Sequence, residues 1–279
     1  MKNTIVNYIT AASLTVLALV SCETQTERIT FEETYEQTLE QTDSAEMSVK
    51  HVIEYYKSLE TGSHARKQAN NTIVKFCFGD AQDGKSVEKA SEAVTDTLMA
   101  AYQADAGEYY KSLLVDIANG YGSESDIFYD VCWYDNTEGH FGDSYGSLQN
   151  YTVLYENYLG GAHGMHGIKN HIIDLKTGLS VTENDIFKPG YVQPVTDLIK
   201  EAMQRTYGKA DDPASDYSGM FQEYMMPNGN CGVSEEGIFW SYNPYEVASY
   251  SEGIITVTVP WKDLEPYINP EIITLNTQR

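Results

Sequence analysis

Residues 151–164 read Tyr151-Thr-Val-Leu-Tyr-Glu-Asn-Tyr-Leu-Gly-Gly-Ala-His-Gly164 and decide how the fold is interpreted. An alternating apolar and aromatic run ends in a glycine pair and a histidine, a pattern typical of a strand that breaks into a loop. In such a loop the backbone can pass close to another molecule. Gly160, Gly161 and His163 are therefore candidate ligand-binding residues.

Further strands and helices are predicted on both sides of this stretch. Two-residue alternation predicts a strand over residues 47–55, and runs of β-branched and aromatic residues predict strands over 127–134, 150–158, 168–175, 237–242 and 253–259. Helical spacing predicts helices over residues 62–78 and 191–207, and a long one that Ser86 caps and Gly107 interrupts. Because strands and helices come in separate runs, we expect an α+β fold, an antiparallel sheet with helices packed on one face.

The first 21 residues have the features of an export signal. Lys2 precedes an apolar run that is too short to span a bilayer, and Leu19-Val20-Ser21-Cys22 resembles a lipobox. We therefore expect a lipoprotein signal peptide at 1–21, a lipidated (palmitate-type) Cys22 and an acidic flexible tether at 22–44, with a possible strand over residues 29–35. An N-terminal α+β region at 45–149 and a C-terminal domain at 150–279 would follow, lipid-anchored to a membrane of the bacterial cell envelope.

The composition limits the class of binding partner and the number of disulfides. Removing Lys2 with the signal takes the formal charge from -23 to -24, which argues against nucleic acid and favours cationic proteins or peptides, although a solvated acidic surface would look the same. Cys77, Cys132 and Cys231 allow at most one disulfide, and their spacing does not select a pair. Buried thiols are the default interpretation of the first two, and Cys231 is expected in a turn.

Three patterns suggest chemistry, and each has a simpler interpretation. Residues 142–146 match the G-x-S-x-G nucleophile elbow, but strand character follows where a helix is required, so a turn between strands is expected. His163, His166 and His171, with Glu156 or Asp174, have metal-ligand residue types, yet strand alternation separates the last two histidines. We expect His163 to bond to its own loop, and His51 to be a core histidine; we assign no catalytic residue, metal or cofactor.

Four motifs occur in an order that resembles the RsiV-like extracytoplasmic domain family, which is shared by the anti-sigma factor RsiV, envelope lipoproteins and polysaccharide deacetylase-associated proteins. They are Tyr158-Leu-Gly-Gly-Ala-His-Gly164, Ile173-Asp-Leu-Lys-Thr-Gly178, Phe239-Trp-Ser-Tyr-Asn-Pro-Tyr-Glu-Val-Ala248 and Gly253-Ile-Ile-Thr-Val-Thr-Val-Pro260.

The resemblance implies an α+β domain without an established catalytic role, which binds lysozyme in the anti-sigma branch. We therefore expect a lipid-anchored, non-catalytic binding module for a cationic envelope or host protein such as lysozyme, or for a glycan. Tyr242, Asn243, Pro244 and Tyr245 would join the glycine-histidine loop in the binding surface. The alternatives are an enzyme that modifies peptidoglycan or another polysaccharide through His163 and nearby carboxylates, and a structural lipoprotein.

Overall fold

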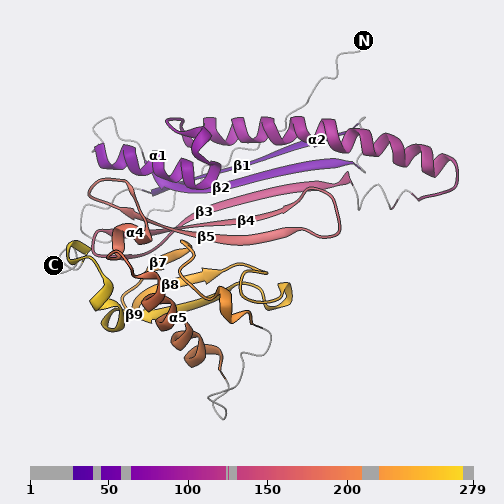
Figure 1. Ribbon diagram of the computed structural model, residues 1–279. Coiled ribbons are helices and arrows are strands. Elements are labelled where there is room, and N and C mark those ends of the chain that lie inside the picture. Colours follow the sequence, from indigo (N-terminus) through magenta and orange to yellow (C-terminus); the bar gives the residue numbers. More distant parts are fainter. Residues whose placement is uncertain are drawn as a thin grey trace. The chain divides into compact units, whose positions relative to one another are not determined.

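The computed structural model describes residues 28–39, 45–57, 64–123, 125, 131–208 and 220–272. Its described strands form a six-stranded sheet in the order β1-β2-β3-β4-β5-β6 and a three-stranded sheet in the order β7-β8-β9, with helices packed alongside (Figure 1). The predicted α+β class, with antiparallel strands and packed helices, is confirmed.

The chain divides into two compact units that are discontinuous in sequence. The first unit comprises Met1–Lys57, Val74–Gly139 and Tyr155–His166, and the second comprises Ser58–Ile73, His140–Leu154 and Gly167–Arg279. The predicted boundary between residues 149 and 150 lies inside strand β4 (Leu148–Tyr158), which contributes residues to both units.

In the first unit, β1 (Arg28–Thr38) and β2 (Glu46–Tyr56) pair antiparallel along their whole length. β2 then pairs in parallel with β3 (Trp133–Tyr145). A parallel pair needs a long crossover, and the connection contains helices α1 (His64–Phe78) and α2 (Val87–Ala118). Helix α2 lies along β1 and β2, over a core that includes Met47, Val49 and Tyr102 (Figure 1).

Strand β1 corrects the prediction of a flexible tether over residues 22–44. Residues 28–38 belong to the sheet, because backbone pairing with β2 and burial of Tyr35 stabilise a segment whose own composition is polar. The strand considered possible at residues 29–35 is present and longer. The predicted signal peptide, Cys22 and residues 40–44 lie outside the described residues.

Helix α2 continues through Gly107, where the sequence suggested an interruption. A single glycine inside a helix costs only about 1 kcal/mol, and the neighbouring Ala106 and Tyr110 are buried against the sheet. At its start, the Ser86 side chain accepts a hydrogen bond from the Lys89 amide, as the cap prediction required.

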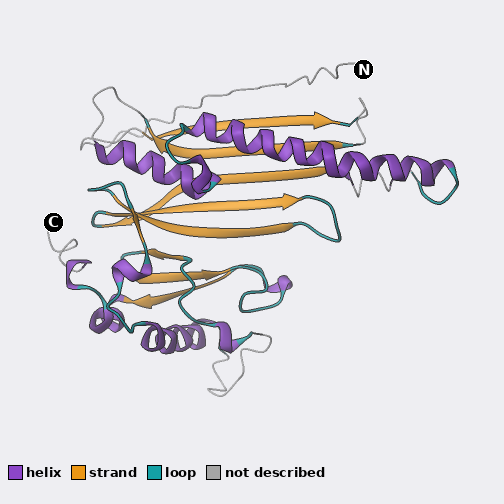
Figure 2. Cartoon of the chain, turned by 45° about the horizontal axis from the view of Figure 1, so that its top comes forward, coloured by secondary structure: helices purple, strands orange, loops and turns teal. Residues whose placement is uncertain are grey.

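The second unit surrounds a large apolar core. Strands β5 (Met165–Asp174) and β6 (Ser180–Val181) pair antiparallel, and so do β7 (Cys231–Val233), β8 (Gly237–Tyr242) and β9 (Ile255–Pro260). Helix α5 (Val192–Tyr207) lies along β9 and buries Val195, Ile199 and Met203 (Figure 2). Short helices α4 (Glu183–Ile186) and α6 (Trp261–Leu264) complete the unit, and Cys231 begins β7 instead of lying in a turn.

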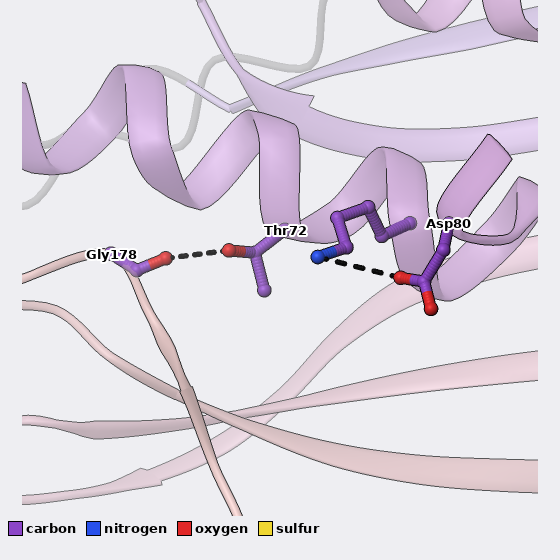
Figure 3. A network of polar contacts seen from close by, with 4 residues as sticks. Thr72, Asp80 and Gly178 are labelled. Atoms are coloured by element: carbon purple, nitrogen blue, oxygen red, sulfur yellow. Dashed lines mark hydrogen bonds and ion pairs between the residues drawn. The ribbon is translucent and has the colours of Figure 1, made fainter. Parts of the chain in front are cut away.

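The turn at residues 174–178 is fastened to the first part of α1. The Thr72 hydroxyl donates to the carbonyl of Gly178 over 2.8 Å, and Figure 3 shows the two facing each other. Gly178 has φ +78, and a Cβ there would overlap the Ala65 carbonyl and lie 2.6 Å from the Ala69 amide nitrogen. The turn therefore needs glycine at this position. Figure 3 also shows the exposed ion pair of Asp80 with Lys75, at 3.4 Å.

Candidate functional site

The loop that follows β8 presents Tyr245 in an unfavourable backbone conformation. Among the described residues, Tyr245 is the one non-glycine residue with positive φ, 72°. Its side chain is 55% exposed, so core packing does not explain this conformation. A bulky residue in the left-handed region costs about 1–2 kcal/mol. Such strain persists where surrounding structure imposes it, and an observed outlier of this kind is a reason to suspect function.

Hydrogen bonds on both sides hold the loop in this conformation. The Tyr245 amide donates to the Ala248 carbonyl at 3.1 Å, and the Glu246 amide donates to the Asn243 carbonyl at 3.0 Å. The Glu246 carboxylate accepts from the Asn243 amide at 3.1 Å and from the Asn228 side chain at 3.1 Å. The Tyr245 ring also packs against the ring of Tyr250, 5.5 Å between centroids. The exposed ring is thus carried by a preorganised loop.

A second segment adjoins this loop and adds exposed apolar side chains. The Phe221 amide donates to the Val247 carbonyl at 2.7 Å, and Met220 forms a β-bridge with Ala248. We call the exposed side chains of the two segments the aromatic patch; they are Phe221 (40% exposed), Tyr224 (58%), Met226 (40%) and Tyr245.

The chain around the aromatic patch is acidic. Residues 220–260 contain no lysine, arginine or histidine and five glutamates, Glu223, Glu235, Glu236, Glu246 and Glu252. All five are exposed. Aromatic rings near exposed glutamates offer a cationic partner both apolar contact and charge attraction, including cation–π contact with lysine or arginine.

Two other residues of the predicted site have structural roles. Tyr242 is 1% exposed, and its hydroxyl donates to the Met226 carbonyl at 2.8 Å, so it supports the loop from inside. The Asn243 side chain accepts from the Ile168 amide at 2.8 Å and donates to the Ile168 carbonyl at 3.1 Å. It thereby pairs with β5 as the backbone of a neighbouring strand would. Pro244, between Asn243 and Tyr245, is partly exposed.

The predicted glycine-histidine turn belongs to the first unit, whereas residues 242–245 belong to the second. Gly160 and Gly161 have φ of +85° and +97°, and a Cβ on Gly160 would lie 3.2 Å from the Trp133 indole nitrogen. The turn thus needs glycine, and Tyr158 closes it by donating to the Gly161 carbonyl at 2.8 Å. His163 is exposed and its Nδ1 lies 2.9 Å from the Gly164 carbonyl, which confirms the expected bond to its own loop. That this turn shares a binding surface with Tyr245 stays a prediction.

The patterns with a possible chemical role form other structures. Residues 142–145 lie in β3 and Gly146 begins the turn to β4, so no helix follows Ser144 as a nucleophile elbow requires. Asp174 holds its own turn by accepting from the Lys176 amide at 3.1 Å and from the Thr177 hydroxyl at 3.1 Å. Within the part of the chain that the structure describes, no three His, Cys, Asp or Glu side chains are placed to hold a metal ion.

A buried carboxylate that sequence reasoning missed, that of Glu183, lies in the second unit. Glu183 accepts from the Trp240 indole at 2.7 Å, the Gly229 amide at 3.0 Å and the Tyr191 hydroxyl at 3.2 Å. Burial and the nearby carboxylate raise the pKa of Tyr191 to about 12, and burial also raises the pKa of the Cys231 thiol. These groups tie α4 and α5 to β7 and β8. The sequence signal is weak, since a glutamate at the first position of a capped helix is ordinarily exposed.

The cysteines and the helices bear on two further sequence predictions, the state of the thiols and the relation to a membrane. Cys77, Cys132 and Cys231 are free thiols, of which Cys231 is buried and the other two are partly buried. None of the helices in the described ranges combines the length and apolar character needed to cross a membrane.

Comparison with known proteins supports the fold. A crystal structure of a DUF3298 family member from Bacteroides fragilis NCTC 9343 is similar over 91% of this chain and 98% of its own, with 21% identity and a TM-score of 0.78. A DUF3298 family protein from Pseudomonas aeruginosa PAO1 is similar over 97% of each chain, with 12% identity and a TM-score of 0.52. No curated protein matches this chain. Residues 184–262, which carry α5, β7–β9 and the aromatic patch, match the family described as "Protein of unknown function (DUF3298)".

Proposed function

We propose that this chain is a lipid-anchored, non-catalytic binding module of the bacterial cell envelope, and that its aromatic patch binds a cationic protein. The observation that carries the proposal is Tyr245, an exposed ring held at φ 72° by its loop. Glycine would adopt this conformation without strain. A tyrosine that adds no buried packing there is best explained by contact with another molecule.

The type of partner follows from charge and from the side chains. Residues 220–260 carry five glutamates and no basic residue, within a chain of formal charge -23. Such a surface repels nucleic acid and attracts cationic proteins at long range. Aromatic side chains with few rotatable bonds are common anchors at protein interfaces. The resemblance to the RsiV-like family suggests a lysozyme-like protein as the first partner to test, with a glycan as the other candidate.

The proposed anchor would hold the module close to the membrane. Because β1 begins at Arg28, residues 23–27 alone separate it from Cys22. Even fully extended, this segment spans at most about 20 Å. In this proposal the sheet itself therefore sits near the membrane surface, on a shorter connection than the sequence suggested.

Titration calorimetry of residues 23–279 with hen lysozyme tests the proposal. We expect binding that weakens with salt and disappears with succinylated lysozyme, whose positive charges are removed. Tyr245→Gly should weaken binding at least about tenfold, because it removes the ring while suiting the backbone. Tyr121→Ala is the matched control, since Tyr121 is 85% exposed but lies in the first unit, outside the patch.

Two outcomes would count against the proposal. Binding that Tyr245→Gly leaves unchanged would place the contact elsewhere on the chain. Heat with peptidoglycan fragments and none with lysozyme or other cationic proteins would favour the glycan. Glu223→Gln provides a second test, because this exposed glutamate lies within the 221–226 segment and its neutralisation should reduce the salt dependence.

A further inference from the structure

A row of polar side chains crosses the interface between α2 and the β1–β2 pair in the first unit. The Glu33 carboxylate accepts from the Tyr35 hydroxyl at 2.7 Å, and that hydroxyl lies 3.2 Å from Ser91 Oγ. Ser91 Oγ lies 2.7 Å from Nδ1 of His51. We call Glu33, Tyr35, Ser91 and His51 the polar seam. It interrupts an otherwise apolar interface that includes Met47, Val49 and Met99.

His51 is enclosed within this seam. Its relative exposure is 0%, and its ring meets the rings of Phe78 and Tyr35 edge-on, with centroids 5.0 Å and 6.3 Å away. Its Nε2 is buried with no hydrogen-bond partner among the described residues. Two other buried atoms also lack a hydrogen-bond partner among the described residues. They are Thr95 Oγ1, one turn beyond Ser91 on α2, and Gln37 Oε1, two residues beyond Tyr35 on β1. The seam therefore holds the neutral imidazole but offers nothing to a proton on Nε2.

Charged groups on the surrounding elements do not supply that missing partner. On β1, Glu33 is the residue in register with His51, and its carboxylate accepts from the Tyr35 hydroxyl. On α2, Glu88 accepts from Tyr55 at 2.9 Å, and Glu92 is exposed. On β3, the residue in register with His51 is Thr137, which is uncharged, and the end of α1 presents Phe78. Burial lowers the pKa of His51 to about 4, because Ser91, its one hydrogen-bond partner in the seam, is uncharged and does not favour the protonated ring.

We propose that the polar seam is a proton-operated latch, in which protonation of His51 releases the first half of α2 from β1 and β2. In the open form the imidazole meets water and accepts a proton near its ordinary pKa of about 6.5. In the closed form the buried imidazole of His51 accepts a proton only near pH 4. The open form therefore binds more protons between these values, and closure strengthens as pH rises through this window. The inference rests on the first unit and is independent of the ligand proposed above.

Hydrogen exchange of residues 23–279, followed by mass spectrometry and corrected for intrinsic rates, tests the latch. For peptides covering residues 86–100, we expect protection to fall about 100-fold between pH 7 and pH 4, the ratio set by the two proton affinities. His51→Asn keeps a polar group near the Nδ1 position and cannot be protonated, so it should show a flat profile. His171→Asn is the matched control, because His171 is a second histidine whose pKa burial lowers to about 4, but it lies in the second unit.

Each outcome of these experiments either supports or overturns the proposed latch. Equal protection of residues 86–100 at both pH values in the unsubstituted protein would overturn the latch. So would opening of His51→Asn at the same pH. If His51→Asn does not fold, the ring proton resonances of His51 in the unsubstituted protein replace it. If these resonances titrate with a midpoint near pH 4, and the protection of α2 is lost at the same pH, the latch is supported. If they titrate near pH 6.5 while α2 is still protected, the latch is refuted.

Discussion

Gly178→Ala is expected to destabilise the second unit far more than an ordinary glycine substitution. Gly178 closes the 174–178 turn at φ +78, against the first part of α1. An alanine there meets three separate difficulties. It is strained in the left-handed region, its methyl group overlaps the Ala65 carbonyl, and relief of that overlap moves the Gly178 carbonyl away from the Thr72 hydroxyl.

Known magnitudes allow these effects to be separated. Left-handed strain costs an alanine about 1–2 kcal/mol. Overpacking against a rigid backbone adds about 1–3 kcal/mol, and loss of the buried Thr72 hydrogen bond adds about 1 kcal/mol. Gly190→Ala isolates the first term, because Gly190 has φ +86 and a Cβ there meets nothing within 4 Å. We expect Gly178→Ala to exceed Gly190→Ala by about 2–4 kcal/mol.

Urea unfolding followed by circular dichroism measures both free energies of unfolding, and a double-mutant cycle adds a finer test. Thr72→Val alone should cost about 1 kcal/mol. In a Gly178→Ala background the same change should cost little, because the hydrogen bond is already broken. Equal losses for Gly178→Ala and Gly190→Ala would refute the close contact between the turn and α1. Full additivity of Thr72→Val would refute the coupling.

Three further predictions address the other features. Glu183→Leu should lower the free energy of unfolding by about 3 kcal/mol or more in a urea titration, because it leaves the donors of Trp240, Gly229 and Tyr191 without their acceptor. Tyr245→Gly should raise that free energy by about 0.5–1 kcal/mol through relief of strain; a loss would mean that the ring supports the loop. Cys22→Ser should abolish incorporation of labelled palmitate and move the protein from the membrane to the soluble fraction, whereas unchanged labelling would contradict the proposed anchor.

The sequence predicts those helices and strands whose own residues carry an apolar pattern. Helix α5 follows directly from apolar residues at helical spacing, and β2 follows from alternation, because each buries one face of a regular element. Strand β1 was only a possibility, since its residues are stabilised by pairing with β2 and by α2, neither of which can be read from the strand itself. The same holds for the polar seam, where Ser91 and His51 are 40 residues apart in sequence.

The sequence predicts the location of the candidate site. It does not distinguish the residues that are exposed to a partner from those that support the loop. Tyr242 and Tyr245 are the same residue type three positions apart, yet one is buried below the loop and the other is exposed. Their difference depends on the positive φ at Tyr245 and on the bond from Tyr242 to the Met226 carbonyl, both set by tertiary structure. The neighbouring segment with Phe221 and Tyr224 carries no motif, and tertiary contacts with Val247 and Ala248 place it beside the loop.

Asparagine explains how the fold can hold a strained tyrosine at the surface. Asn243, Asn230 and Asn150 each use both ends of a side-chain amide to pair with backbone of another segment, at Ile168, at residues 168 and 170, and at Val233. Each one adds hydrogen bonds between segments that do not pair with each other as strands, and satisfies backbone groups that would otherwise lose water. Asn243 thereby fixes the start of the loop whose far side presents Tyr245. The motif Asn-Pro-Tyr-Glu thus combines a support residue, Asn243, with a cap, Glu246, around one exposed ring. These bonds come from Asn243, Glu246 and backbone groups, so none of them depends on which side chain occupies position 245.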